Sequence, residues 1–289
     1  MGRKFLIGLL AVALGVIGCV VVLSSENAVV VNPKGIIAES ILKVIVTDIL
    51  LMLIVILPTY IFLFWVVWKY CIQRKNAPYD PEHAAGPLGE MLMWILPSLV
   101  IAVMGLFLWK ATHRLNPYKP LESDVKPLAV QVIALNWKWL FIYPEQGIAT
   151  LNYFAIPEQT PIHLRLTADE APMNSFWVPQ LSGQIYAMTG MTTQLHLMAN
   201  GPGEYVGRAV EINGEGYSSM TFAAKSSSVK EFEEWVAEVK KSPHHLSHEA
   251  YKALVKPAVD PSVILFSEIE QDLFPGIVHK YMYPAEPVL

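Results

Sequence analysis

Two long runs without a charged residue restrict this chain more than any other feature of its sequence. The first, ILLMLIVILPTYIFLFWVVW, covers residues 49–68, and the second, MLMWILPSLVIAVMGLFLW, covers residues 91–109. A helix of about 20 residues rises about 30 Å, which is the thickness of the hydrocarbon core of a bilayer. We therefore expect two transmembrane helices. Each contains a proline, and Pro58 is expected to kink the first helix.

The composition indicates membrane segments joined to a globular part. Of the 289 residues, 53% are hydrophobic and only 16% are charged, and the mean hydropathy is +0.39. These values lie outside the range of ordinary soluble domains. The net charge of −4 gives no basic surface that would favour nucleic acid. The two cysteines, Cys19 and Cys71, are far apart in unlike surroundings, so a disulfide framework is not indicated.

The N-terminal stretch MGRKFLIGLLAVALGVIGC has the layout of a secretory signal. Arg3 and Lys4 form a short basic region, an apolar run follows, and the small residue Gly18 precedes Cys19. The letters VIGC also resemble the bacterial lipoprotein box, in which the cysteine is diacylated and becomes the new N-terminus. We predict a lipoprotein signal peptide over residues 1–18 and lipidation of Cys19. The alternative is an uncleaved signal anchor with an incidental buried cysteine, and the sequence does not decide whether cleavage occurs.

Basic residues set the predicted topology. Lys69, Arg74 and Lys75 cluster where the first helix ends, which places the short connecting loop in the cytoplasm. The signal requires, independently, that the segment after Cys19 be exported. Both arguments give a periplasmic N-terminal segment (19–40), a transmembrane hairpin (41–112) and a periplasmic remainder.

The exported remainder is long enough for a domain with its own core. PIHLRLTAD and TTQLHLMAN alternate apolar and polar residues, which is typical of half-buried strands. Several such short strands with Gly and Pro between them predict an all-β sandwich over residues 125–227. Residues 228–289 are expected to form a small helical appendage, with a capping box from Ser228 to Glu231 and a second helix near Ser247. On the helix that begins after Ser228, one apolar stripe is expected, made of Val229, Phe232, Trp235, Val236 and Val239.

These parts together resemble subunit II of the haem–copper respiratory oxidases over nearly the whole chain. EMLMWILP matches the Glu-x-x-x-Trp-x-x-Pro of that family's second helix, and NWKWLFIY is similar to its aromatic stretch. MNSFWVPQL and GRAVEINGEGYSSMTF resemble the segments that carry its copper ligands. The resemblance implies a cupredoxin-like fold for residues 125–227 and an aromatic-rich motif for residues 228–289.

In the cytochrome c oxidases of the family, this domain holds two copper ions through two Cys, two His, a Met and a Glu carbonyl. Here the family's first His position is Asn174, its two Cys positions are Ala209 and Asn213, and its second His position is Tyr217. Two family positions are retained, namely Glu211 and Met220. Soft thiolates are what hold copper in such sites. The resemblance therefore predicts no copper, no haem and no other metal in this chain.

Loss of these ligands in this family marks the quinol oxidases, and YPEQGIATLN and QIYAMTGMTTQLHL resemble that branch of subunit II. The implied complex oxidises ubiquinol, reduces dioxygen to water and moves protons outward. Haem and copper would lie in subunit I, and subunits I, III and IV and membrane lipid would be partners. The resemblance does not distinguish ubiquinol from menaquinol as the substrate, and it does not identify the haem types of subunit I. The alternatives are a cytochrome c oxidase subunit II and a membrane-tethered cupredoxin-like binding module, which would not co-purify with haem.

Three further sets of side chains have two interpretations each. Glu90 lies at the cytoplasmic edge of the second helix, and the resemblance implies a role in proton uptake, the alternative being a plain interfacial charge. Trp137 and Trp139 correspond to a stretch that conducts electrons in the copper-bearing relatives, but packing is favoured here. A solvated loop is favoured over a metal site for His244, His245 and His248.

Overall fold

The computed structural model describes residues 28–70, 86–171, 173–259, 262–270 and 272–282, together with residues 15, 18, 21, 24 and 25. The chain divides into two compact units, and each is considered by itself. One comprises Ser40–Asn116, and the other comprises Met1–Glu39 with Pro117–Leu289. Cys19 and Cys71 lie outside the described residues, as does most of the predicted signal peptide.

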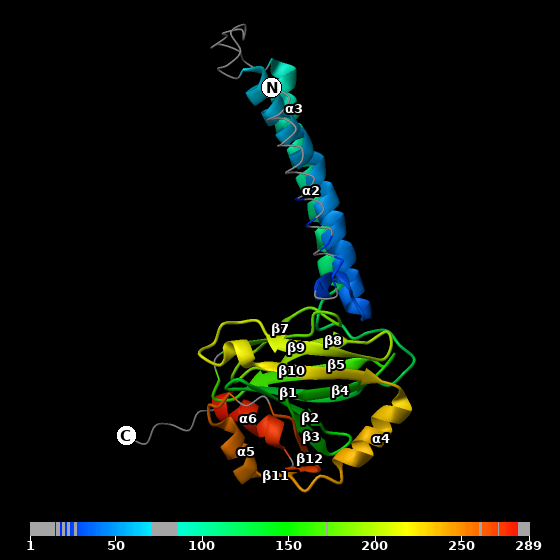
Figure 1. The fold of residues 1–289 in the computed structure, drawn as a ribbon, viewed down its shortest axis with the longest axis vertical. Helices are drawn as coiled ribbons and strands as arrows, with labels where there is room; N and C mark the ends of the chain where they lie inside the picture. Colours follow the sequence, from blue (N-terminus) through cyan, green and yellow to red (C-terminus); the bar gives the residue numbers. More distant parts are fainter. Residues whose placement is uncertain are drawn as a thin grey trace, which may run out of the picture. The chain divides into compact units, whose positions relative to one another are not determined.

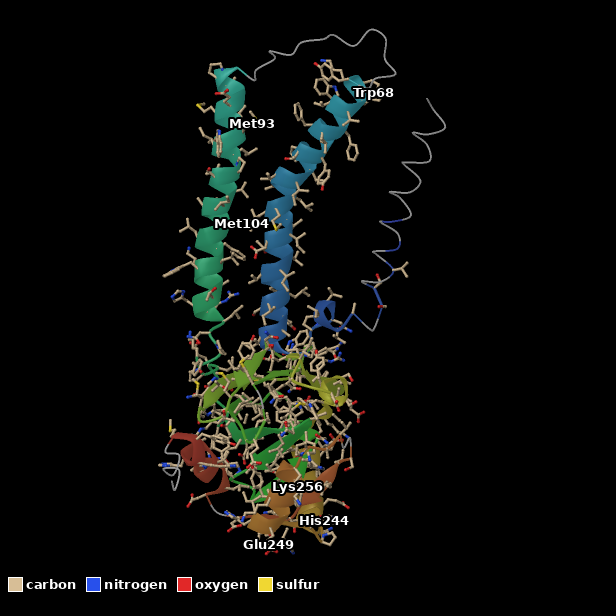
Figure 2. All side chains as sticks on the ribbon, turned by 90° about the vertical axis from the view of Figure 1, so that its left-hand side faces the viewer. Trp68, Met93, Met104, His244, Glu249 and Lys256 are labelled. Atoms are coloured by element: carbon tan, nitrogen blue, oxygen red, sulfur yellow. The ribbon has the colours of Figure 1, made fainter. Side chains whose placement is uncertain are left out.

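Two long helices confirm the predicted transmembrane segments. α2 (Ile36–Lys69) contains Pro58, and α3 (Pro87–Arg114) contains Pro97. Both are long and apolar enough to cross a membrane, and most of their large apolar side chains are exposed (Figure 2). α2 begins before residue 41, where the hairpin was expected to start. The helix begins at Ile36 because Pro33 and Gly35, which disfavour a helix, lie just before it. The charged residues between Ile36 and residue 49 do not interrupt a helix.

The part of the chain that follows α3 contains a β-sandwich of two sheets, as predicted. The first sheet has the order β12-β3-β2-β1-β5-β8, with bounds β1 (Leu128–Leu135), β2 (Lys138–Tyr143), β3 (Ile148–Leu151), β5 (Ile162–Ala168), β8 (Thr193–Leu197) and β12 (Ile264–Phe266). The second has the order β4-β10-β9-β6-β7, with bounds β4 (Tyr153–Pro157), β6 (Asn174–Trp177), β7 (Ile185–Ala187), β9 (Gly203–Ala209) and β10 (Thr221–Ser227).

Alternation along the strands produces the core between the sheets. In β5, Ile162, Leu164 and Leu166 are buried in the main cluster, while Arg165 on the opposite face is exposed. β5 pairs in parallel with β1, and β4 pairs in parallel with β10, whereas the remaining strand pairs of the sandwich are antiparallel. The sandwich therefore joins strands that are distant in the sequence.

The C-terminal region adds a third layer to the sandwich. It contains α4 (Val229–Val239), β11 (His245–Leu246), α5 (His248–Val255), β13 (Glu268–Ile269) and α6 (Leu273–Met282). Figure 1 shows α5 and α6 beside β2 and β3. A second hydrophobic cluster lies there, between the outer face of the first sheet and these elements; it includes Ile133, Leu140, Tyr251 and Phe274.

Both helices predicted in this region are present. Ser228 and Glu231 form the capping box of α4, since the Ser228 side chain accepts from the Glu231 backbone and the Glu231 side chain accepts from the Ser228 backbone. Ser247 caps α5 by accepting a hydrogen bond from the backbone N–H of Ala250. Phe232 and Val239 of the predicted α4 stripe are buried.

A short segment before α2, which we call the N-terminal strap (residues 32–35), binds the sandwich. The backbone N–H of Lys34 donates to the Gln180 carbonyl over 2.7 Å, and the Lys34 carbonyl accepts from the backbone N–H of Asn200 over 2.9 Å. Gly35 fits against the Leu181 backbone so closely that a Cβ atom there would lie 2.6 Å from the Leu181 carbonyl oxygen. Only glycine fits this contact without a shift of the backbone.

Two histidines fix the linker that follows α3. His163 of β5 and His196 of β8 are cross-strand neighbours, and their rings stack with centroids 4.6 Å apart and an interplanar angle of 5°. His196 Nδ1 donates to the carbonyl of Pro117 over 2.9 Å, and His163 Nε2 lies 3.1 Å from Gln194 Oε1. Because both partners are oxygen acceptors, these two ring nitrogens carry the protons. Burial is the main cause that lowers the pKa of His163, and His196 lowers it further.

Candidate functional site

Three elements bring the predicted copper-ligand positions together. Asn174 is the first residue of β6, Ala209 is the last residue of β9, and Met220 lies directly before β10. β6 pairs with β9 through Phe176 and Ala209. The backbone N–H of Ala209 donates to the Met220 carbonyl over 3.0 Å. The loop between β9 and β10 therefore closes over the start of β6.

Amide side chains fill the centre of this arrangement. Asn213 Nδ2 donates a hydrogen bond to Asn174 Oδ1 and lies 3.9 Å from Met220 Sδ. Asn174 and Met220 are buried, and Asn213 is half-buried. Asn174 and Asn213, two of the six predicted copper-ligand positions, thus contact each other directly, and Met220 lies at the edge of that contact. We call Asn174, Asn213 and Met220 the amide cluster.

Glu211 and Tyr217 lie on either side of Asn213 in the loop. Tyr217 begins a short 3₁₀ helix (Tyr217–Ser219) and packs against the main core, and Glu211 is half-buried beside the exposed Ile212. Amide oxygens, a phenol and one thioether are a poor donor set for copper, which prefers thiolate and imidazole in this geometry. In the described part of the chain, no three His, Cys, Asp or Glu side chains gather in a way that could hold a metal ion.

The contacts of Trp137 and Trp139 are packing contacts. Trp139 is fully buried and meets Phe176 edge-on, with centroids 5.4 Å apart and an interplanar angle of 79°. Trp137 has a positive φ of 62° in the turn between β1 and β2, and its ring lies on the loop. A Cβ on Gly216 would lie 2.3 Å from that ring. The loop therefore keeps its shape through Trp137 and the glycine beneath it.

Glu90 belongs to the other compact unit. It is exposed in the first turn of α3, whose N-cap is Gly86. A carboxylate is favourable in the first turn because the amide ends of the helix give it partial positive charge. Residues 71–85, which precede this turn, lie outside the described residues.

The three histidines are exposed, as expected for a solvated segment, but only His244 lies in a loop. His245 belongs to β11 and pairs with Glu268 of β13, and His248 is the first residue of α5. His248 Nδ1 lies 2.9 Å from Glu270 Oε2, and His245 Nδ1 lies 3.6 Å from Glu268 Oε2. His244 lies on the surface of the C-terminal region (Figure 2). Carboxylates more than twenty residues away in the sequence thus lie beside two of these histidines, and the local sequence could not indicate these pairs.

One buried carboxylate was missed by the sequence interpretation. Asp169, only 2% exposed, follows β5 and joins the sandwich to the C-terminal region. It accepts hydrogen bonds from Tyr251 Oη over 2.6 Å, from Tyr281 Oη over 2.7 Å and from Lys280 Nζ over 3.0 Å. Lys280 also pairs with Glu170 over 2.7 Å. We call Asp169, Tyr251, Lys280 and Tyr281 the Asp169 network.

The network shifts the titration of its members. Burial, and then the hydrogen bond to Asp169, raise the pKa of Tyr251 and of Tyr281. For Lys280, burial opposes the charged form, but the hydrogen bonds to Glu170 and Asp169 outweigh it and raise the pKa. The phenols and the ammonium therefore stay protonated at neutral pH, as donors to one carboxylate.

Comparison with known proteins agrees with this architecture. The model of the cytochrome c oxidase subunit II periplasmic domain matches residues 146–227, and that of the COX aromatic-rich motif matches residues 240–285. The cytochrome bo(3) ubiquinol oxidase subunit 2 of Pseudomonas putida is 46% identical over 259 residues, covering 90% of this chain and 82% of that protein. Ubiquinol oxidase subunit 2 of Acetobacter aceti is 42% identical over 270 residues, covering 93% and 87%.

A membrane hairpin, a cupredoxin-like sandwich and an aromatic-rich C-terminal layer define the class as subunit II of the haem–copper oxidases. The identity with the two relatives is far above what the fold alone requires, and it extends over nearly the whole chain. The chain belongs to the ubiquinol oxidase subunit 2 family. It is therefore one subunit of a multi-subunit oxidoreductase, which confirms the predicted resemblance and excludes the free-standing binding module.

Proposed function

We propose that this chain is the metal-free subunit 2 of a proton-translocating oxidase that takes its electrons from ubiquinol. The complex would oxidise quinol and reduce dioxygen to water, with haem and copper in subunit I and with subunits III and IV as further partners. The observation that carries the proposal is the amide cluster. Asn213 donates to Asn174 at positions where a copper-bearing relative would place a thiolate and an imidazole.

An electron relay through the exported domain needs a metal that these side chains do not hold well. Quinol is soluble in lipid and can deliver electrons within the membrane, so the domain needs no relay. The retained loop, held by Trp137 and Gly216, would then serve assembly with subunit I and cover its periplasmic side.

Copper loading tests this proposal. Residues 117–289, expressed alone and incubated with copper(II), should retain no stoichiometric metal after gel filtration. The protein should also lack the purple absorption of a copper–thiolate centre, because the described part of this segment gathers no thiolate or histidine ligand set. One or two tightly bound copper ions per chain would contradict the proposal.

Glu90 is proposed to assist proton uptake from the cytoplasm. The basic cluster near Lys69 sets this edge of the membrane inside the cell, and an exposed carboxylate there raises the local proton concentration by electrostatic attraction. Glu90→Ala should lower quinol oxidase activity several-fold with unchanged haem content, and Glu90→Asp should retain more activity. A variant that assembles normally and turns over at the wild-type rate from about pH 6 to pH 9 would leave Glu90 as an interfacial charge.

The chain is proposed to reside in the bacterial inner membrane, with the sandwich in the periplasm and an acyl anchor on Cys19. Mass spectrometry of the mature N-terminus decides the anchor, since an intact Met1 with an unmodified Cys19 would contradict it. Cys19→Ser should stay membrane-bound. Each buried CH₂ of an acyl chain contributes about 0.8 kcal/mol, and this adds to two spanning helices that suffice without it.

A further inference from the structure

Most polar side chains in the apolar part of α2 have partners within the helix. Thr47 Oγ1 donates to the Lys43 carbonyl over 2.7 Å, and Thr59 Oγ1 donates to the Val55 carbonyl over 2.7 Å. Hydroxyl groups can be satisfied in this way because helix carbonyls have a spare lone pair. A threonine in a membrane helix therefore needs no partner outside that helix.

Asp48 cannot be satisfied in the same way. A carboxylate only accepts hydrogen bonds, and the backbone N–H groups inside a helix are already used by the helix itself. Its Oδ1 atom is buried and has no hydrogen-bond partner among the described residues. Glu39, the other acid of α2, differs because Asn200 Nδ2 donates to it over 2.6 Å.

The position of Asp48 makes the lack of a donor costly. It directly precedes the charge-free run of residues 49–68, so it lies where the hydrocarbon core begins. Ionisable side chains at this depth are rare and pair with one another or with other polar groups. Asp48 belongs to a less exposed stripe of its helix: Val44, Thr47, Asp48, Leu51 and Val55 are half-buried at helical spacing, and Leu53 is half-buried outside that stripe. The side chain as a whole is half-buried, which leaves it within reach from outside the hairpin.

We propose that Asp48 pairs with a basic side chain on a membrane helix of another subunit of the oxidase. The chain is one subunit of several, and the apolar side chains of both its helices are largely exposed, which leaves room for a helix of another subunit beside them. A Lys or Arg there supplies both the positive charge and the donors that Asp48 lacks. This inference rests on membership of the complex and is independent of the roles proposed for Glu90 and the amide cluster.

Substitution of Asp48 in the whole complex tests the pairing. The oxidase is purified through a tag on the haem-bearing subunit, and the amount of this chain that remains bound is measured as the detergent concentration rises. Asp48→Leu should lower retention at least several-fold relative to wild type, because it leaves a basic group of the partner unpaired in the membrane. The retention of Asp48→Asn should lie between that of wild type and that of Asp48→Leu. Asp48→Lys should be retained least, because it places two like charges together.

Thr47→Val is the matched control, since it removes a neighbouring polar group that is satisfied inside the helix, and it should be retained like wild type. Leucine favours membrane insertion, so the level of Asp48→Leu in whole membranes should match wild type. Two results would overturn the proposal. In one, Asp48→Leu is retained like wild type, which means that the carboxylate is neutral or hydrated. In the other, Asp48→Lys is retained better than Asp48→Leu, which means that the partner is not basic.

Discussion

Removal of the charge of Asp169 should release the C-terminal layer from the sandwich. Asp169→Asn keeps the size of the side chain but replaces one acceptor oxygen with an NH₂ donor. In the unsubstituted chain, the Asp169 carboxylate accepts hydrogen bonds from two phenols, those of Tyr251 and Tyr281, and from Lys280. Asparagine is neutral and accepts through one oxygen only, so at least one of these donors loses its acceptor and the others lose a charged acceptor.

The size of the effect follows from the burial of each contact. A hydrogen bond to a charged group contributes about 1.5–3 kcal/mol. The Lys280 contact counts for less, because the lysine side chain is 46% exposed and also pairs with Glu170. With one enclosed bond lost and another weakened, we expect Asp169→Asn to lower the free energy of unfolding by about 2–4 kcal/mol.

Urea unfolding of the full chain in detergent, followed by tryptophan fluorescence, measures this free energy. Hydrogen exchange measures protection of α5 and α6 in the same samples. Glu249→Gln is the control, because it also removes one negative charge, but from an exposed position on α5, and it should stay within about 0.5 kcal/mol of wild type. An Asp169→Asn variant with wild-type stability and wild-type protection of α6 would refute the reasoning.

Two further predictions concern the contacts that hold the segments flanking the membrane helices. The folded state lowers the pKa of His163, so below about pH 6.5 the unfolded chain binds more protons and stability falls with falling pH. His163→Gln should flatten that part of a stability profile measured by thermal unfolding between about pH 5 and pH 8, and an unchanged slope would contradict this. Gly35→Ala should cost about 1–3 kcal/mol and expose the N-terminal strap to proteolysis, because its Cβ would meet the Leu181 carbonyl at 2.6 Å. Gly201→Ala is the control, because its Cβ would meet only one side-chain atom, at 3.9 Å, and it should leave stability and cleavage unchanged. Equal cleavage of both variants would refute the argument.

Local patterns predicted the elements that depend on local physics. The alternation in PIHLRLTAD gives β5, because a strand with one buried face needs a period of two. The Ser228–Glu231 box gives the start of α4, because both partners lie within one turn. The two apolar helices follow from bilayer thickness alone.

What the sequence could not show depends on contacts between distant residues. Asp169 meets its partners 82, 111 and 112 residues later, and nothing around it distinguishes it from a surface acid. The same holds for the parallel pairing of β1 with β5, since alternation predicts a strand but not its neighbour. Asn174 and Asn213 are 39 residues apart, and only the resemblance to a known family suggested that they would meet.

The third layer has a consequence for the way this chain reaches its folded state. The outer face of β1 and β2 carries Ile133 and Leu140, and their covering residues include Tyr251 and Phe274. During synthesis the strands emerge well before α5 and α6 do. Until the last 40 or so residues have emerged, the sandwich presents an uncovered apolar surface of the kind that leads to aggregation. A chain cut short near residue 240 would keep that surface uncovered permanently, so chaperones and proteases should distinguish such truncated chains from those that carry α5 and α6.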